Sequence, residues 1–255
     1  MTQAEAPLSR RERQREATFT EIVAASRALL AQDSELSLRA VAQQMGMTAP
    51  ALYRYVANYQ ELVDLVAFEI DKTATALFAA AADAYPAEDP AARLVAAITE
   101  FRMWAHTHRR EFVLTFANPV ADSSCVRREL ITSATSGHLM TDLMFEVWAD
   151  RQFDVPALAD LPETVQEAIR TPLMPAKIDR IPEESRGLAW AYIQGWTALY
   201  GVVALEVMGH MDPRLIESGE MFIDVVTRFA PSMGLEGDVP RLVAQMRERI
   251  RAQSG

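Results

Sequence analysis

Apolar residues recur along this chain at spacings of three and four positions, the period of an α-helix with one buried face. Turns containing Pro, Gly or Asp separate the segments that show this period. The segments predict helices at 10–31, 37–45, 48–55, 60–84, 90–108, 111–117, 123–148, 163–170, 183–210, 213–230 and 238–251. No stretch alternates apolar and polar residues as a half-buried strand would, and no repeat of 20–50 residues occurs. We therefore expect an all-α fold.

The segment 37–56, SLRAVAQQMGMTAPALYRYV, predicts two short helices joined by a tight turn. Ser37 stands before the first helix, where its hydroxyl can accept from the free amides of the first turn. Gly46 lies where that helix must end in a conformation that suits glycine. Thr48 offers a second N-cap, and Pro50 falls in the first turn of the next helix, where its missing N–H costs nothing. Such a pair, packed on a preceding helix, is how helix-turn-helix proteins place a helix in the major groove of DNA.

Composition sets broad limits on the class of protein. At 255 residues, half of them apolar, the chain is long enough for a small domain and a larger one. Its single cysteine, Cys125, excludes an internal disulfide and suits a reducing compartment. The polar N-terminal sequence, MTQAEAPLSRRERQRE, lacks the pattern of a secretory signal. We therefore expect a cytoplasmic protein.

Charge is distributed unevenly between the two parts of the chain. Residues 1–60 contain seven arginines and six acidic residues, so the net charge of −10 lies in the remainder. Four of these arginines cluster at positions 10, 11, 13 and 15. A nearly neutral, arginine-clustered N-terminal part on an acidic body permits phosphate binding at one end only, although arginine-rich N-termini are also commonly solvated tails.

The predicted helix 60–84 leaves the N-terminal part without a Gly- or Pro-rich linker. Its apolar stripe is formed by Leu62, Val66, Ile70 and Leu77. We therefore expect a rigid connection instead of a flexible tether. The expected domains are 1–58, an N-terminal arm with the helix-turn-helix, and 59–255, a larger helical body.

The predicted helix 183–210 is the most apolar of the chain, with no charged residue between Arg186 and Glu206. A membrane span is one interpretation. Against it, the stretch is solitary and includes Gln194 and two glycines, Gly195 and Gly201. We expect a helix buried on all sides that contacts its own core on one face and a partner subunit on the other, with no membrane involved. The glycines would let another backbone approach closely.

The stretch 41–66, VAQQMGMTAPALYRYVANYQELVDLV, resembles the signature of TetR/AcrR-type one-component transcriptional regulators. In that pattern a helix and a Gly turn precede Leu-Tyr-x-His-Phe-x-x-Lys-x-x-Leu. Leu52-Tyr53 and Leu62 match it, whereas Tyr55, Val56 and Tyr59 stand at the His, Phe and Lys positions. A second resemblance, to the Trp-His-Gly motif of one type of C-terminal domain in that family, lies at 196–201, WTALYG, with Tyr200 in place of His.

The resemblance implies a homodimer whose two heads bind successive major grooves of a pseudo-palindromic operator in double-stranded DNA. It also implies a body that binds a small-molecule effector and mediates dimerisation. The expected function is a ligand-responsive repressor, released from its operator by a small apolar or amphipathic molecule when the helix 60–84 moves the heads.

DNA contacts are expected from the helix 48–55 and its neighbours. Arg39 matches a family position that can reach the groove, and bidentate contact with guanine is its natural chemistry. Tyr53 and Tyr55 are expected to bind phosphates; the alternative for Tyr53 is packing on the first helix, and both roles are compatible because a Tyr can bury its ring and expose its hydroxyl. Tyr59 replaces a phosphate-binding Lys, which predicts a shallower salt dependence. The full set of expected contacts is Arg39, Thr48, Ala49, Pro50, Ala51, Tyr53, Tyr55 and Tyr59.

Aromatic and Met residues of the body are the candidates for an effector cavity. Such residues line ligand cavities, but they also fill ordinary helical cores. The candidates are Phe101, Trp104, Phe116, Met140, Met144, Trp148, Trp196 and Tyr200.

Catalytic and metal chemistry find little support in the sequence. His106 and His108 fall on different helix faces, and His138 with Asp142 would supply half a metal site. There is no Gly-rich phosphate loop, nucleophile elbow or HExxH motif. We expect no enzyme activity, metal or cofactor. The alternative is an all-α ligand-binding or catalytic protein whose head has lost DNA binding and serves as an interaction surface, an interpretation that the substitutions at Tyr55, Val56 and Tyr59 leave open.

Overall fold

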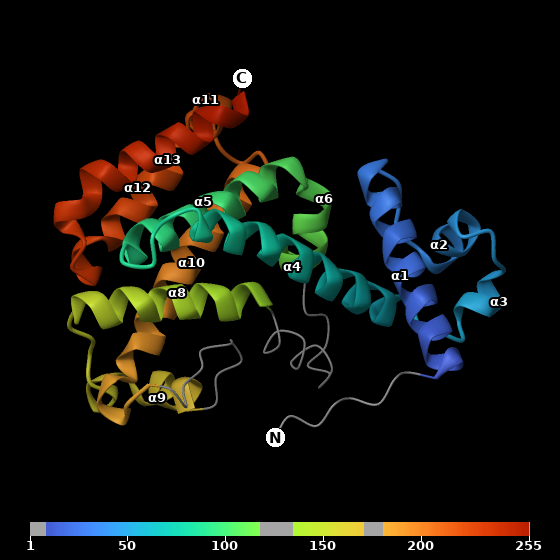
Figure 1. Cartoon of the computed structure of the whole chain (residues 1–255), viewed down its shortest axis with the longest axis horizontal. Helices are drawn as coiled ribbons and strands as arrows, with labels where there is room; N and C mark the ends of the chain where they lie inside the picture. The colour runs from blue at the N-terminus through green and yellow to red at the C-terminus, as the bar shows by residue number, and fades with distance from the viewer. Residues whose placement is uncertain (1–8, 118–134, 171–180, 255) are drawn as a thin grey trace. The chain divides into compact units, whose positions relative to one another are not determined.

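The structure, a computed structural model, describes residues 9–117, 135–170 and 181–254 (Figure 1). The N-terminal helices are α1 (Arg10–Ala31), α2 (Leu38–Gln44), α3 (Ala49–Leu52), α4 (Tyr59–Asp83), α5 (Pro90–Thr107) and α6 (Arg109–Phe112). The π-helical turn η1 (Val113–Ala117) follows. Beyond residue 134 lie α8 (Thr135–Arg151), α9 (Glu163–Arg170), α10 (Gly187–Val207), α11 (Pro213–Ser218), α12 (Glu220–Phe229) and α13 (Val239–Ser254). The short 3₁₀ turns are η2 (Leu158–Asp160), η4 (Glu183–Ser185), η5 (Pro231–Met233) and η6 (Glu236–Asp238). No strand occurs in the described part of the chain, and the all-α prediction is confirmed.

The chain divides into two compact units. The head comprises residues 1–70 and 110–116, and the body comprises residues 71–109 and 117–255. The division falls inside α4, so one continuous helix begins in the head and ends in the body. The sequence led us to expect a boundary at residue 58, just before this helix, whereas the observed division lies between residues 70 and 71, inside the helix.

In the head, α1 and α2 pack together and α2 packs on α3. Buried Ile22 and Leu29 of α1 share the core with Val41 of α2 and Leu52 at the end of α3. An ion pair joins α1 to α6: the guanidinium of Arg27 donates to both carboxylate oxygens of Glu111, over 2.7 and 3.1 Å. These contacts explain why residues 110–116 belong to the head although they follow α5 in sequence.

In the body, α5 packs against α8, α13 and α10, and α10 packs against α12. Bidentate ion pairs secure α13 to the α5 region: Arg249 binds Glu100 over 2.8 and 3.0 Å, and Arg241 binds Asp89 over 2.7 and 2.9 Å. Asp89 is also the N-cap of α5. The packing of α13 on the α5 region thus combines buried apolar contacts with two partly exposed ion pairs.

A buried carboxylate of α4 caps α8 from outside that helix. Asp71 Oδ2 accepts from the backbone amides of Thr135, at 2.7 Å, and Ser136, at 3.3 Å. Asp71 also accepts from both of their hydroxyls. A negative charge near the N-terminal end of a helix satisfies free amides and interacts favourably with the helix dipole, so Asp71 stabilises α8 at Thr135 and Ser136.

Two sequence expectations are wrong in detail. Leu77 is 49% exposed, because the stripe of α4 continues instead through buried Ala74, Phe78 and Ala82. The single helix expected at 213–230 is broken at Gly219, whose φ of 68° ends α11. A Cβ there would lie 2.6 Å from Cδ1 of Ile250, so both conformation and space favour glycine.

The segment Glu183–Val207 is, among the described residues, the one helix long and apolar enough to span a membrane, with a mean hydropathy of 1.2. Length and composition do not distinguish a span from a core helix. Leu199, Val203 and Val207 are buried inside the body. The opposite face carries exposed Thr197 and Leu205. The helix is therefore buried on one face only in the single chain.

Candidate functional site

The α2–turn–α3 segment of the head forms as local sequence chemistry requires. Ser37 is the N-cap of α2, and its hydroxyl accepts from the Ala40 amide at 3.2 Å. Gly46 follows α2 with a φ of 66°, in the left-handed region. Thr48 stands at the N-cap of α3, but its side chain makes no capping hydrogen bond. The Thr48 hydroxyl, which is exposed, is thus not committed to the helix start.

The side chains expected to contact DNA are mostly at the surface of the head. Arg39, Thr48, Pro50, Tyr53 and Tyr59 are exposed, and Ala49, Ala51 and Tyr55 are half-buried. Among the described residues, the Arg39 side chain has no hydrogen-bond or ion-pair partner. An exposed, unpaired guanidinium is available to bind an acceptor pair on another molecule.

The two tyrosines of α3 and its following turn differ in environment. Tyr53 is 52% exposed. Tyr55 contacts the first helix: its ring lies edge-on to Phe19 of α1, with centroids 5.9 Å apart and planes at 89°. Tyr55 therefore positions the end of the segment on α1, as an edge-to-face aromatic pair does.

The sequence predicts a helix over 48–55 as the one that contacts DNA, and the helix in the structure, α3, is shorter. α3 ends at Leu52, and three turn residues continue to Tyr55. Arg54 lies in this turn and is exposed, and in the described structure its side chain has no hydrogen-bond or ion-pair partner. Arg54 is not among the contacts expected from the sequence, although it is the one basic residue between Arg39 and Lys72.

The start of α4 is fixed by its own side chains. Asn58 Oδ1 accepts from the Glu61 amide at 2.9 Å, and Glu61 Oε2 accepts from the Ala57 amide at 2.5 Å. Tyr59, at the first position of the helix, is 49% exposed. The Glu61 carboxylate at this helix start disfavours an approaching phosphate, and Tyr59 supplies no positive charge to offset it.

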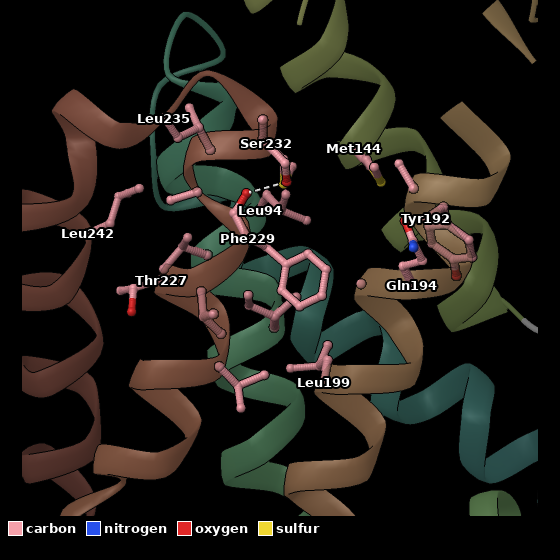
Figure 2. A pocket seen from close by; sticks show the side chains of 18 of the residues that line it. Leu94, Met144, Tyr192, Gln194, Leu199, Thr227, Phe229, Ser232, Leu235 and Leu242 are labelled. Atoms are coloured by element: carbon pink, nitrogen blue, oxygen red, sulfur yellow. Dashed lines mark hydrogen bonds between the residues drawn. The ribbon is translucent and has the colours of Figure 1, made fainter. Parts of the chain in front are cut away.

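A mostly apolar cavity of about 190 Å³ lies within the body (Figure 2). Its walls come from α5, α8, α10, α12 and α13, together with η5 and the segment before η2. Figure 2 shows Phe229 and Leu94 near Leu199, with Tyr192 and Gln194 side by side on the α10 wall. The Ser232 hydroxyl is occupied, because it donates to the Phe229 carbonyl at 2.8 Å. Burial raises the pKa of Tyr192 to about 12, so this lining residue is neutral at physiological pH.

A family model described as tetracyclin repressor-like, C-terminal domain, matches residues 94–229, more than half of the chain. The chain belongs to the TetR family of regulators. The matched region contains most of α5 and all the described residues of α8–α12, which supply most of the cavity walls. The crystal structure of SCO4313, a protein described as a candidate regulatory protein, has a similar fold, with a TM-score of 0.55 and 24% identity. The similarity covers 85% of this chain and 98% of that one. No curated protein sequence matches the chain significantly.

The effector candidates of this TetR-family chain fall in several places. Met140, Met144 and Trp196 line the cavity, and the other candidates do not. Phe101 and Trp104 are buried in the body core, both edge-on to Phe78. The remaining candidates are Tyr200, stacked on Trp196, Trp148, edge-on to Phe145, and Phe116, stacked on Phe112 in the head. Whether any of them binds an effector stays a prediction.

Several lining residues were not expected from the sequence. Phe229 of α12 and Leu242 and Met246 of α13 lie on helices whose apolar faces read as ordinary core. Asp154 and Gln194 also line the cavity. Their signal in the sequence is faint, since Asp154 is one of two acids in a Pro-containing connection and Gln194 is a lone amide in an apolar helix.

The described part of the chain contains no cluster of three or more His, Cys, Asp or Glu residues that could bind a metal ion. His106 instead contacts Glu206, with Nε2 and Oε2 2.9 Å apart. Cys125 lies outside the described residues.

Proposed function

We propose that this chain is a ligand-responsive, DNA-binding transcriptional regulator of the cytoplasm. In this proposal it is a homodimeric repressor, released from its operator by a small apolar or amphipathic molecule. One observation carries the proposal: a single chain joins a head with an exposed helix-turn-helix surface to a body with a preformed apolar cavity. α4 belongs to both units and provides one of the covalent connections between them.

Readout of DNA would divide between base and phosphate contacts. Arg39 can present a guanidinium fork to the O6 and N7 acceptors of guanine. Thr48, Ala49 and Ala51 offer mainly methyl groups, which suit the C5-methyl of thymine. Because hydrogen-bonding side chains are few here, DNA shape would contribute part of the specificity.

Phosphate contacts would fix the head on the duplex without reading its sequence. Tyr53 carries an exposed hydroxyl for this purpose, and neighbouring Arg54 carries an exposed guanidinium. We add Arg54 to the expected contacts on that basis. The positive charge of Arg54 compensates in part for the one that is missing because Tyr59 stands in place of a Lys.

The exposed face of α10 supports the homodimer. Thr197, Gly201, Leu205 and Met208 recur along it at spacings of four and three residues. Leu205 and Met208 are both 44% exposed, and a Cβ on Gly201 would meet nothing within 4 Å. A partner helix could therefore approach closely at Gly201 while covering both apolar side chains. A two-fold axis through such a face would pair it with itself.

Selection of bound fragments from random duplex DNA tests the proposal. The wild-type protein is expected to enrich an inverted repeat whose half-site centres lie one helical turn apart, about 34 Å. Arg39→Ala is expected to lose preference at one base position in each half-site, at a cost of about 1–3 kcal/mol per contact. The matched control is Arg228→Ala, which removes an exposed arginine of the body that pairs with Asp224.

Three outcomes separate the parts of the proposal. Enrichment of an inverted repeat by wild type and Arg228→Ala, with altered preference in Arg39→Ala, supports DNA reading by this surface. Enrichment that Arg39→Ala leaves unchanged would remove Arg39 from the readout. No enriched repeat at moderate salt would overturn the DNA-binding function and favour the alternative of a head that binds another partner.

A further inference from the structure

The cavity wall carries one charged side chain among the residues that the structure describes, and that side chain is negative. Asp154 contributes a carboxylate to a lining that is otherwise apolar or neutral, with no Lys, Arg or His in it. Tyr192 does not add a second charge, because its phenol is neutral at physiological pH. An apolar cavity with a single carboxylate is complementary to a ligand with an apolar body and one positive charge.

The Asp154 carboxylate is available to a ligand. In the described part of the chain it has no hydrogen-bond or ion-pair partner, and it is exposed. The nearest arginine in sequence, Arg151, does not neutralise it, because Arg151 pairs with Asp150 at 2.8 Å and with Asp238 at 3.1 Å. Asp238 in turn pairs with Arg241 at 2.7 Å.

The position of this carboxylate is set by packing on the cavity wall. A Cβ at Gly234 would lie 3.6 Å from the Cβ of Arg151 and 3.9 Å from that of Phe153. The segment that leads to Asp154 therefore passes against the turn that follows Ser232 and Met233, two lining residues. Because Asp154 is exposed and lines the cavity, it lies where the cavity opens to solvent.

A second free polar group lies on the α10 wall. The Gln194 side chain has no hydrogen-bond partner in the described structure, and it lies beside Tyr192 (Figure 2). Its amide can both donate to and accept from a ligand. The hydroxyls of Ser232 and Thr227 are already engaged with backbone carbonyls, so they are less available.

We propose that the effector is an amphipathic monocation, held by its apolar body in the cavity and by its ammonium group at Asp154. This inference rests on the proposed effector function of the cavity and names the chemistry of its ligand. The volume of about 190 Å³ suits a single aromatic ring with a short chain, since a cavity of about 150 Å³ accommodates benzene.

Three probes of equal size test the charge preference: 3-phenylpropylamine, 3-phenylpropan-1-ol and 3-phenylpropanoate. Each is titrated by calorimetry into the full-length protein at neutral pH and low salt. The amine is expected to bind about fivefold more tightly than the alcohol, which matches the upper end of the range for an exposed ion pair. The carboxylate probe is expected to bind more weakly than the alcohol. Raising the salt concentration should reduce the advantage of the amine.

Variants place the effect at Asp154. Asp154→Asn keeps the shape of the side chain and should remove the advantage of the amine over the alcohol. Its matched control, Asp160→Asn, changes an exposed acid on the same connection that does not line the cavity, and the advantage should remain. Leu94→Trp narrows the cavity and should weaken all three probes.

The outcomes separate this inference from the function on which it rests. If the alcohol binds and Leu94→Trp weakens it, the cavity is a ligand site. An amine that then binds no better than the alcohol, or an advantage that persists in Asp154→Asn, would overturn the monocation. If none of the three probes binds, the effector function of the cavity fails and the inference fails with it.

Discussion

The Arg102–Glu206 pair of the body provides a prediction whose size follows from burial. Arg102 Nε donates to Glu206 Oε2 over 2.6 Å, with side chains that are 3% and 0% exposed. A second Arg102 nitrogen donates to the Ile216 carbonyl at 2.5 Å. His106 contacts the same Glu206 oxygen, whereas Oε1 has no hydrogen-bond partner in the described structure. The cluster joins α5 and α10, two walls of the cavity, to α11.

Arg102→Met removes the positive charge and keeps an unbranched side chain. It leaves the Glu206 carboxylate buried without its main partner, a change that costs about 3–5 kcal/mol in comparable buried pairs. At about 2–4 °C per kcal/mol for a protein of this size, the midpoint of thermal unfolding should fall by about 6–20 °C. Glu206→Met should be similarly destabilising, because it strands the guanidinium.

The double variant decides between a specific ion pair and general core damage. Arg102→Met with Glu206→Met leaves no buried charge, so it should be more stable than either single variant. The free energies of unfolding are measured by chemical denaturation followed by tryptophan fluorescence, at one fixed protein concentration. Single variants that lose less than about 1 kcal/mol, or a double variant whose loss equals the sum of the two, would refute the reasoning.

Three further changes test the head, the cap and the dimer. Tyr59→Lys should neutralise one more phosphate charge for each head. The slope of log affinity for DNA against log salt concentration, measured by fluorescence anisotropy, should therefore become steeper by about 0.9 per head. An unchanged slope would contradict this. Asp71→Asn should cost about 1 kcal/mol, because Thr135 and Ser136 lose a charged acceptor at the start of α8, and calorimetry should show a lower unfolding midpoint. Leu205→Glu should yield monomers in light scattering after gel filtration, and a retained dimer would place the interface elsewhere.

Local sequence patterns predict most of the helices because capping and apolar period depend on near neighbours. α1 and α9 begin and end where the sequence indicates, and Ser37 and Gly46 play the roles expected of them. The TetR resemblance, read from the segment 41–66, agrees with the family shown by the body.

Features set by distant contacts could not be predicted in the same way. Leu77 and Phe78 are equally apolar, and the packing of α4 in the body determines which of them is buried. Gly219 breaks a predicted helix where Ile250 leaves no room for a side chain. The flanking sequence does not distinguish Leu77 from Phe78, whereas the dipeptide Ser218-Gly219 is a turn signal within the predicted helix.

The cavity was the hardest feature to predict. Aromatic and Met content indicates which residues can line a void, but the void itself depends on how several separate helices fail to fill the space between them. Phe101 and Trp104 are therefore packed in the body core, whereas Met140, Met144 and Trp196 line the cavity, and the sequence alone does not distinguish the two groups. Asp154, the one charged residue among the described residues that line the cavity, lies in a connection without a helical apolar pattern, so the sequence does not identify it.

Control of the head by the body is tested by measuring the affinity of the protein for its selected operator with and without a compound shown by calorimetry to occupy the cavity. Saturation with the compound should weaken operator binding by about 5–150-fold, the usual range of coupling between two sites. Linkage requires that operator DNA weaken binding of the compound by the same factor. Leu94→Trp should raise the concentration of the compound that the response requires, because it weakens binding in the cavity. An operator affinity that stays constant at full occupancy of the cavity would contradict control of the head by the body.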